Sequence, residues 1–435
     1  MKNSIKCFTT IILLISTLIA EAQTLVSGGI YSNTTWTKAN SPYLADTVVV
    51  FPNVTLTIEP GVVVTVRGNL EIRQATLIAE GTATDSITFI GILPIRSDGD
   101  TLPSRVINYY NALSSKMNYC IIKDNALGNY ISYGIYARLN STTDSLIIKN
   151  SYFTNNGTAL MGLFSTISID SCLFENNLIA VHQSALTITN SILRKNQNAL
   201  LFAKGAIIRN CIIDSNTYIG IEASGFDTIT NCQIRNNGTG IECSSAIGYG
   251  SQIHNNTIEN NNIGVQLSSP DLEFSSDSIY CNKICNNTTY NVKATTSYNR
   301  IVANNYWCTN DSLTIANSIY DGYDNTSLGL VNFMPIDTIQ CYSITGIPNY
   351  EIPSLSFHVF PNPASDYLMI ELPANNSKTD IKIFNLLGEV AYSSTLISRK
   401  TAIDISTMTN GMYIIQITTG NNIAQQKFIK EKNIR

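Results

Sequence analysis

The sequence predicts an all-β protein in which a right-handed parallel β-helix is followed by a small C-terminal β-sandwich. Three observations support this prediction. An apolar residue and an asparagine recur together at a nearly constant spacing, short apolar stretches alternate with turn residues, and the pattern changes near residue 357. Beyond the N-terminus, no apolar period of helical type extends over a useful length.

The recurring unit is a large apolar residue, here named the anchor, followed three positions later by an asparagine. Successive anchors lie 19 to 31 residues apart. The nine anchors are Ile122, Phe153, Phe174, Leu193, Ile213, Ile234, Ile258, Ile284 and Trp307, and the matching asparagines are Asn125, Asn156, Asn177, Asn196, Asn216, Asn237, Asn261, Asn287 and Asn310. A period of roughly 20 to 50 residues is typical of stacked repeats.

Each repeat holds three short apolar stretches separated by Asn, Gly and Ser, which predicts three strands per coil. Equivalent positions then stack about 4.8 Å apart. Asparagine suits such a column because it tolerates left-handed turns and its amide pairs with the amide of the next coil. We therefore expect a structural asparagine ladder. Residues 92–117 break the pattern and are expected to form a loop.

The position after the anchor carries charges that alternate in sign from coil to coil. They are Glu175, Arg194, Asp214, Arg235 and Glu259. Opposite charges on neighbouring strands are mildly stabilising. We interpret this column as a solvated ladder of ion pairs and not as an active site.

Residues 1–22 have the features of a secretory signal peptide: Lys2 and Lys6, an apolar run, and the small-residue site Ala20-Glu21-Ala22. Without them, 25 basic and 30 acidic residues leave a formal charge of −5. This balance argues against nucleic acid as a partner. No later stretch of 18 apolar residues occurs, so no transmembrane segment is expected.

The pattern of the chain predicts four parts: the signal peptide 1–22, the β-helix 23–345, a linker 346–356, and a β-sandwich 357–435. The linker is polar and contains two prolines. The last part holds several short strand-like stretches with turn residues between them.

Nine of the ten cysteines remain in the mature chain. Cys285 and Cys308 each follow an anchor in adjacent coils, so their spacing permits a disulfide, with two free thiols as the alternative. Four others share the position two before the anchor and are expected to be buried thiols: Cys120, Cys172, Cys211 and Cys232. No Cys-x-x-Cys pair occurs, and we expect no metal site.

Four motifs occur in order near the C-terminus: Val359-Phe360-Pro361-Asn362-Pro363, Ile383-Phe384-Asn385-Leu386-Leu387-Gly388, Asn410-Gly411-Met412-Tyr413, and Lys427-Phe428-Ile429-Lys430. Together they resemble the C-terminal sorting domain of the type IX secretion system of Bacteroidota. The resemblance assigns the sorting motif to Pro361, Asn362, Pro363, Gly388, Gly411 and Tyr413. It implies export by that machinery to the outer-membrane surface or the extracellular space, with attachment to surface lipopolysaccharide or release.

The coils resemble the pectate-lyase-like superfamily of right-handed β-helices, through Asn-x-x-Ile-x-x-Asn units and both ends of the solenoid. Enzymes of that group cleave acidic polysaccharides, but their aspartate clusters and Gly-His-Gly motifs are absent here. No cofactor is expected. Calcium held by Asp321, Asp324 and Asn325 is the alternative to a simple turn at these residues.

One outward column differs from the solvated faces. It contains Tyr136, Met161, His182, Leu201, Glu222, Glu242, Gln266 and Lys293. Glu222, Glu242 and His182 are the candidate catalytic residues, since two close carboxylates resemble the pair of a retaining glycosidase. Tyr136, Gln266 and Lys293 are candidate ligand-binding residues. A solvated face without function is the alternative for all of them.

These observations favour a secreted or cell-surface β-helix that binds extended glycans or acts as an adhesin. Its partners would be an extracellular polysaccharide and the secretion machinery. The alternatives are a polysaccharide lyase or glycoside hydrolase that uses Glu222 and Glu242, and a surface spacer without a ligand.

Overall fold

A computed structural model describes residues 23–92, 105–125, 132–141, 143–163, 166–183, 185–244, 250–269, 277–339, 357–372, 379–385, 390–396, 400–419 and 422–431. The signal peptide 1–22, the linker 346–356 and Gly388 of the sorting motif lie outside these residues.

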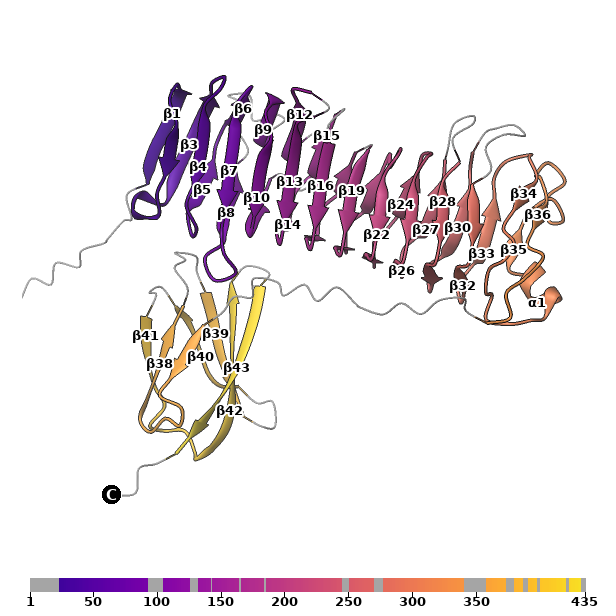
Figure 1. Ribbon diagram of the computed structural model, residues 1–435. Coiled ribbons are helices and arrows are strands. Elements are labelled where there is room, and N and C mark those ends of the chain that lie inside the picture. Colours follow the sequence, from indigo (N-terminus) through magenta and orange to yellow (C-terminus); the bar gives the residue numbers. More distant parts are fainter. Residues whose placement is uncertain are drawn as a thin grey trace, which may run out of the picture.

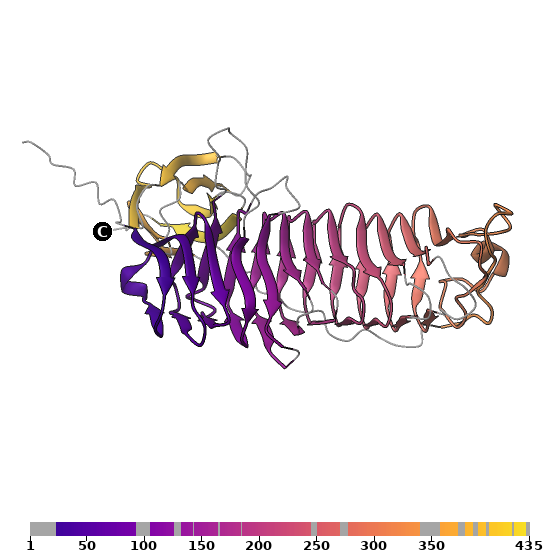
Figure 2. The same ribbon diagram turned by 90° about the horizontal axis from the view of Figure 1, so that it is seen from above.

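The solenoid winds its strands into three parallel sheets, and the strands follow one another as rungs along its axis (Figures 1 and 2). The first sheet consists of β2 Thr34–Trp36, β4 Thr55–Ile58, β7 Thr76–Glu80, β10 Ser115–Asn118, β13 Ser145–Lys149, β16 Thr166–Asp170, β19 Leu186–Thr189, β22 Ile207–Arg209, β25 Thr228–Thr230, β28 Gln252–His254 and β31 Ser278–Tyr280.

The second sheet carries the anchors. Its strands are β5 Val63–Val66, β8 Ile87–Gly91, β11 Cys120–Lys123, β14 Tyr152–Thr154, β17 Leu173–Glu175, β20 Ile192–Arg194, β23 Ile212–Asp214, β26 Gln233–Arg235, β29 Thr257–Glu259 and β32 Lys283–Cys285. Phe153 and Phe174 stack inside the core with ring centroids 4.5 Å apart.

The third sheet consists of β6 Asn69–Arg73, β9 Arg105–Ala112, β12 Tyr133–Leu139, β15 Thr158–Gly162, β18 Ile179–His182, β21 Asn198–Leu201, β24 Ile219–Ala223, β27 Thr239–Cys243, β30 Ile263–Leu267, β33 Tyr290–Ala294 and β35 Ile319–Tyr320. The long strands β1 Thr24–Ile30 and β3 Tyr43–Val50 run along both the second and third sheets and join them.

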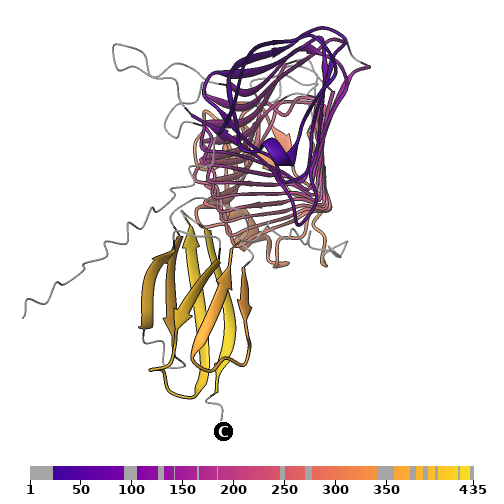
Figure 3. The same ribbon diagram turned by 90° about the vertical axis from the view of Figure 1, so that its left-hand side faces the viewer.

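Seen along the axis, successive coils superimpose around one central core (Figure 3). The predicted right-handed parallel β-helix is therefore confirmed. The described residues also include a 3₁₀ turn, η1 Lys38–Asn40, and the short helix α1 Ser312–Ala316, which follows the last complete coil together with the strand pair β34 Arg300–Ile301 and β36 Val331–Asn332.

The asparagine ladder lies inside the turn between the second and third sheets. Asn177 Oδ1 accepts hydrogen bonds from both the backbone N–H and the side-chain amide of Asn156, each 3.0 Å long. The same pair of bonds repeats through Asn196, Asn216, Asn237, Asn261 and Asn287. The prediction failed at the last coil, where Asn291 accepts from Asn287 and Asn310 is solvent-exposed.

The predicted ion-pair ladder on the second sheet is present in part. Arg194 pairs with Glu175 at 2.9 Å and Arg235 with Asp214 at 3.2 Å, whereas Glu259 pairs at 2.6 Å with Lys283, which lies outside the predicted column. The expectation of a solvated face was wrong at Glu175, which is buried. The loop expected over residues 92–117 was wrong in its second half, because β9 and β10 continue the third and first sheets there. The sequence of β9, Arg-Val-Ile-Asn-Tyr-Tyr-Asn-Ala, lacks strict alternation and hid this strand.

The C-terminal part is a β-sandwich with its own core. One sheet contains β37 His358–Phe360, β38 Tyr367–Glu371 and β41 Lys400–Asp404, and the other contains β39 Thr379–Phe384, β40 Val390–Leu396, β42 Gly411–Thr419 and β43 Asn422–Lys430. Every strand pairing within these two sheets is antiparallel.

Candidate functional site

The outward side chains of the third sheet form one row along the solenoid axis. Adjacent strands pair in register, so each residue stands beside its equivalent on the next coil. The part of the row hereafter called the third-face strip consists of Tyr136, Met161, His182, Leu201, Glu222, Glu242, Gln266, Lys293 and Tyr320. It brings the six candidate residues from the sequence into a single surface feature.

Phe202 is added to this strip by a β-bulge that the sequence analysis missed. Leu200 pairs with Ile221, but the next backbone bond runs from Ala203 N–H to the Glu222 carbonyl, so one extra residue is accommodated. That residue is Phe202, whose φ of 54° is rare for a bulky side chain and whose side chain is 53% exposed. The bulge directs an aromatic ring into solvent where a regular strand would not.

The Phe202 ring stacks on the imidazole of His182, with centroids 4.8 Å apart and planes inclined by 16°. Partial burial lowers the pKa of His182, which favours the neutral imidazole. Among the described residues, no hydrogen bond joins His182 to Glu222 or Glu242. The register places it two coils from Glu222, and its contact is with an aromatic ring instead of a carboxylate.

Glu222 and Glu242 stand opposite each other on β24 and β27. Glu222 accepts hydrogen bonds from the backbone N–H of Phe202 at 3.3 Å and from Ser244 Oγ at 3.1 Å. Glu242 accepts one from Gln266 Nε2 at 3.1 Å. Both side chains are half-buried, and within the described ranges neither forms an ion pair.

Beyond Glu242 the strip continues with uncharged polar groups. Gln266 Nε2 also donates to Ser268 Oγ at 3.1 Å, and the Thr295 hydroxyl lies 3.1 Å from the same oxygen. Lys293 follows in register with Gln266, and then Tyr320, whose ring packs against Tyr290 with centroids 5.1 Å apart. Gln266, Ser268 and Thr295 thus form a connected set of hydrogen-bonding side chains beside Glu242.

Tyr136 lies at the other end of the strip, four coils from Glu222. Its ring contacts Tyr133 at 5.4 Å, and the guanidinium of Arg105 lies 4.0 Å from the ring centroid. Tyr136 is thus separated from the glutamates by Met161, His182 and Leu201.

The turn that contains Phe226 is held by hydrogen bonds to a buried carboxylate, that of Asp227. The sequence analysis did not single out this residue. Asp227 accepts from the backbone N–H groups of Ala206 at 2.8 Å and Gly225 at 2.9 Å, and from Ser251 Oγ at 3.1 Å. Burial raises the pKa of Asp227 to about 6, opposed by these bonds and assisted by nearby Asp277. The turn presents Phe226, which has a φ of 59° and is 58% exposed.

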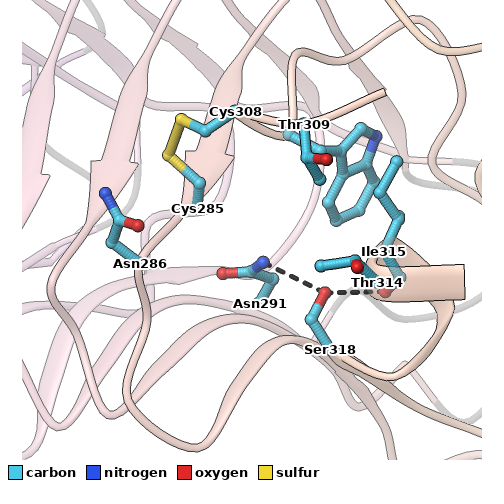
Figure 4. Close-up of a pocket in the computed structure, with 9 residues that line it drawn as sticks. Cys285, Asn286, Asn291, Cys308, Thr309, Thr314, Ile315 and Ser318 are labelled. Carbon is cyan, nitrogen blue, oxygen red and sulfur yellow. Dashed lines mark hydrogen bonds between the residues drawn. A yellow bond between two sulfur atoms is a disulfide. The ribbon is translucent and has the colours of Figure 1, made fainter. Parts of the chain in front are cut away.

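A separate pocket of about 270 Å³ lies at the C-terminal end of the second sheet (Figure 4). Its wall contains the Cys285–Cys308 disulfide, with Cα atoms 6.0 Å apart. The remaining lining residues are uncharged: Asn286, Asn291, Trp307, Thr309, Thr314, Ile315 and Ser318. Asn291 donates to Ser318 Oγ at 3.0 Å across the pocket (Figure 4). The pocket holds no group suited to acid–base catalysis.

The other candidate positions serve local structure. Asp321 accepts from the backbone N–H groups of Tyr323 at 2.9 Å and Val331 at 2.8 Å, and Asp324 accepts from the N–H of Asp321. These bonds describe a turn. In the part of the chain that the structure describes, no three His, Cys, Asp or Glu side chains converge as a metal site would require.

Two residues of the sorting motif, Asn362 and Tyr413, form contacts within the C-terminal sandwich. Asn362 Oδ1 accepts from the backbone N–H of Ile429 at 2.9 Å, which ties the start of the domain to its last strand. The Tyr413 hydroxyl donates to the Thr409 carbonyl at 2.9 Å, and its ring stacks on Phe428. Gly411 has a φ of 154°, which glycine adopts readily.

Two family models match separate parts of the chain. Residues 358–431 match the family described as a secretion system C-terminal sorting domain, and residues 165–325 match the family described as periplasmic copper-binding protein (NosD). The predicted sorting domain is thereby confirmed. No curated protein gives a significant match.

Three solved structures illustrate the likeness of the solenoid. The periplasmic alginate epimerase AlgG has a TM-score of 0.38 at 10% identity, over 71% of this chain and 85% of that one. A mutant of it reaches 0.42 at 11% identity with the same coverage. The A-module of the Azotobacter vinelandii mannuronan C-5 epimerase AlgE4 gives 0.35 at 12% identity, over 74% and 91%. At these values no activity is transferred to this chain.

Proposed function

We propose that this chain is an exported β-helix protein that binds extended glycans along the third-face strip. Its sorting domain indicates export through the type IX secretion system to the cell surface or the extracellular space. Within the part of the chain that the structure describes, no helix is both long and apolar enough to cross a membrane. Attachment to surface lipopolysaccharide would make the protein an adhesin, whereas release would make it a secreted glycan binder.

The observation that carries this proposal is the bulge at Phe202. A half-exposed aromatic ring, stacked on His182, lies on the same strip as carboxylate, amide and hydroxyl groups. Aromatic faces pack on the apolar faces of sugar rings while polar neighbours bind hydroxyls. Because the strip follows the solenoid axis, it suits an extended chain better than a compact ligand.

Copper binding, named in the description of the matched family, is not supported by the residues of this chain. The described part of residues 165–325 contains two histidines, His182 on the third sheet and His254 on the first. The cysteines there are buried thiols or are oxidised. These side chains offer no convergent set of imidazole and thiolate ligands.

Affinity electrophoresis of the mature chain through gels that contain single polysaccharides tests the proposal. We expect retardation by at least one polysaccharide, and loss of that retardation in Phe202→Ala. Tyr280→Ala is the matched control, since Tyr280 is 40% exposed and stacks on His254 at 5.1 Å on the first sheet. Equal losses in both variants, or retardation in neither wild type nor control, would contradict the proposal.

The register of Glu222 with Glu242 favours a second candidate, a glycoside hydrolase of the retaining type. Sizing the products after incubation with each polysaccharide separates the two functions. New reducing ends that disappear in Glu222→Gln and in Glu242→Gln would establish hydrolysis. Unchanged polymer length, with binding intact, would leave binding as the function.

A further inference from the structure

The centre of the third-face strip carries two negative charges that no cation of the strip neutralises. Glu222 is held by a backbone N–H and a serine hydroxyl, and Glu242 by a glutamine amide. All three donors are uncharged. The nearest cation in the strip is Lys293, separated from Glu242 by the coil of Gln266 and hence by roughly 10 Å.

The opposite side of the pair adds no positive charge. Leu201 comes before Glu222 in the strip and is uncharged, and burial lowers the pKa of His182 on the coil beyond it, which favours the neutral imidazole. The charged column of the second sheet differs, since each of Glu175, Asp214 and Glu259 has a basic partner there. Carboxylates with a basic partner therefore occur on the second sheet of this solenoid. Glu222 and Glu242 have no basic partner among the residues of the strip.

A ligand carboxylate placed against Glu222 and Glu242 would meet two like charges in a half-buried surface, where screening by water is weak. A sugar hydroxyl at the same place would donate to a carboxylate oxygen and form a charge-assisted hydrogen bond. The backbone N–H of Phe202 binds Glu222, and the Phe202 ring, which stacks on His182, offers packing without charge.

We propose that Glu222 and Glu242 are specificity-determining residues that admit neutral, hydroxyl-rich glycans and exclude polyuronates. The inference rests on the proposed function, because it concerns which glycans the third-face strip accepts. In this proposal the two glutamates select among glycans without cleaving them. The preference for neutral glycans comes from these side chains and not from the fold alone.

The test compares two classes of polymer by affinity electrophoresis of the mature chain. The neutral probes are a mixed-linkage β-glucan and a galactomannan, and the acidic probes are polygalacturonate and alginate. We expect a neutral probe to bind at least about tenfold more tightly than either acidic one at low salt. In the double variant Glu222→Gln, Glu242→Gln, polyuronate binding should rise by roughly tenfold.

Lys293→Gln is the matched control, because it removes one charge of opposite sign from the same strip. It should weaken polyuronate binding, because it removes a positive charge from the strip. Melting temperatures within a few degrees of the wild type would show that the variants fold.

The outcomes separate the two proposals. Polyuronate binding equal to or tighter than neutral binding in the wild type would overturn the specificity and leave glycan binding standing. Discrimination that persists unchanged in the double variant would overturn the role of the two glutamates. Retention by neither class would overturn both proposals.

Discussion

Glu222 and Glu242 occupy equivalent positions on adjacent coils, and the Ser244 hydroxyl and the Gln266 amide bind one carboxylate each. The two side chains are neighbours because a parallel β-helix repeats its strands in register about 4.8 Å apart. Their hydrogen-bond donors come from the coil before Glu222 (Phe202), from the coil of Glu242 (Ser244) and from the next one (Gln266). The arrangement is therefore a property of four successive coils.

The asparagine ladder should contribute strongly to stability. Asn216→Ala leaves the N–H and the amide of Asn196 without their acceptor inside the core, and we expect a loss of about 1–3 kcal/mol. Urea unfolding measures it. Asn310→Ala is the control, since Asn310 shares the sequence pattern but is exposed. A larger loss of unfolding free energy in Asn310→Ala than in Asn216→Ala would contradict the prediction that the buried ladder stabilises the fold.

Asp227 should make the fold more stable in mild acid. Its folded pKa of about 6 lies above the ordinary value of 3.8, so the stabilisation by its proton is complete below pH 3.8 and is lost as pH rises to about 6. The difference amounts to about 3 kcal/mol. Urea midpoints measured between these limits should fall with rising pH in the wild type and change less in Asp227→Asn.

The pKa of Asp311 is shifted in the opposite direction from that of Asp227. Hydrogen bonds from Thr314 lower the pKa of Asp311, so its stabilisation is present above pH 3.8 and is lost as pH falls through the lowered value. Removing it in Asp311→Asn should not flatten the profile between pH 4 and 6. A profile that Asp311→Asn flattens as much as Asp227→Asn does would contradict the assignment.

The disulfide should stabilise the C-terminal end of the solenoid. Cys285 and Cys308 are 23 residues apart, and closing a loop of this length contributes about 3 kcal/mol. Cys285→Ser should lower the unfolding midpoint accordingly, as should treatment of the wild type with reductant. No change in either case would mean that the bond does not form in the exported protein.

The interior thiols should behave differently from this disulfide. Cys120, Cys172, Cys211, Cys232 and Cys243 are buried and free, and burial raises the pKa of Cys172 to about 12. Thiolate is the reactive species, so a thiol reagent should label these residues only after unfolding. Mass spectrometry of peptides from native and denatured protein identifies which residues react.

Export should depend on the C-terminal domain. A chain truncated after residue 345 should remain in the periplasm, since it lacks the domain matched over residues 358–431. Asn362→Ala should weaken the domain, because it removes the acceptor for the Ile429 N–H. Fractionation and immunoblotting report both effects, and normal surface display of the truncated chain would contradict them.

The fold was largely predictable because each repeat carries the same residue types at the same positions. A large apolar anchor and an asparagine recur in almost every coil, and both are buried where the spacing predicts. The ladder ended one coil early because Asn291 accepts the bonds expected to reach Asn310. The coil at which the ladder ends depends on which residue accepts the last pair of hydrogen bonds. The period of the sequence does not predict that residue.

The third-face strip was only partly predictable. Its register follows from the repeat, but Phe202 enters through an extra residue between Leu200 and Ala203, where the equivalent coil has Ile221, Glu222 and Ala223. Aligning these two stretches shows the insertion and is the signal that would have revealed it. Asp227 left no such signal, because its burial depends on turns from three coils.

Calorimetric titration of the mature protein with the polysaccharide that retards it most would test the central claim directly. We expect Phe202→Ala to weaken binding by roughly tenfold, because burying a Phe side chain contributes about 1.5–3 kcal/mol and each 1.4 kcal/mol is about a factor of ten, while Tyr280→Ala binds as the wild type does. Affinity that is unchanged in Phe202→Ala, from protein shown to be folded, would contradict the claim that the third-face strip binds glycans.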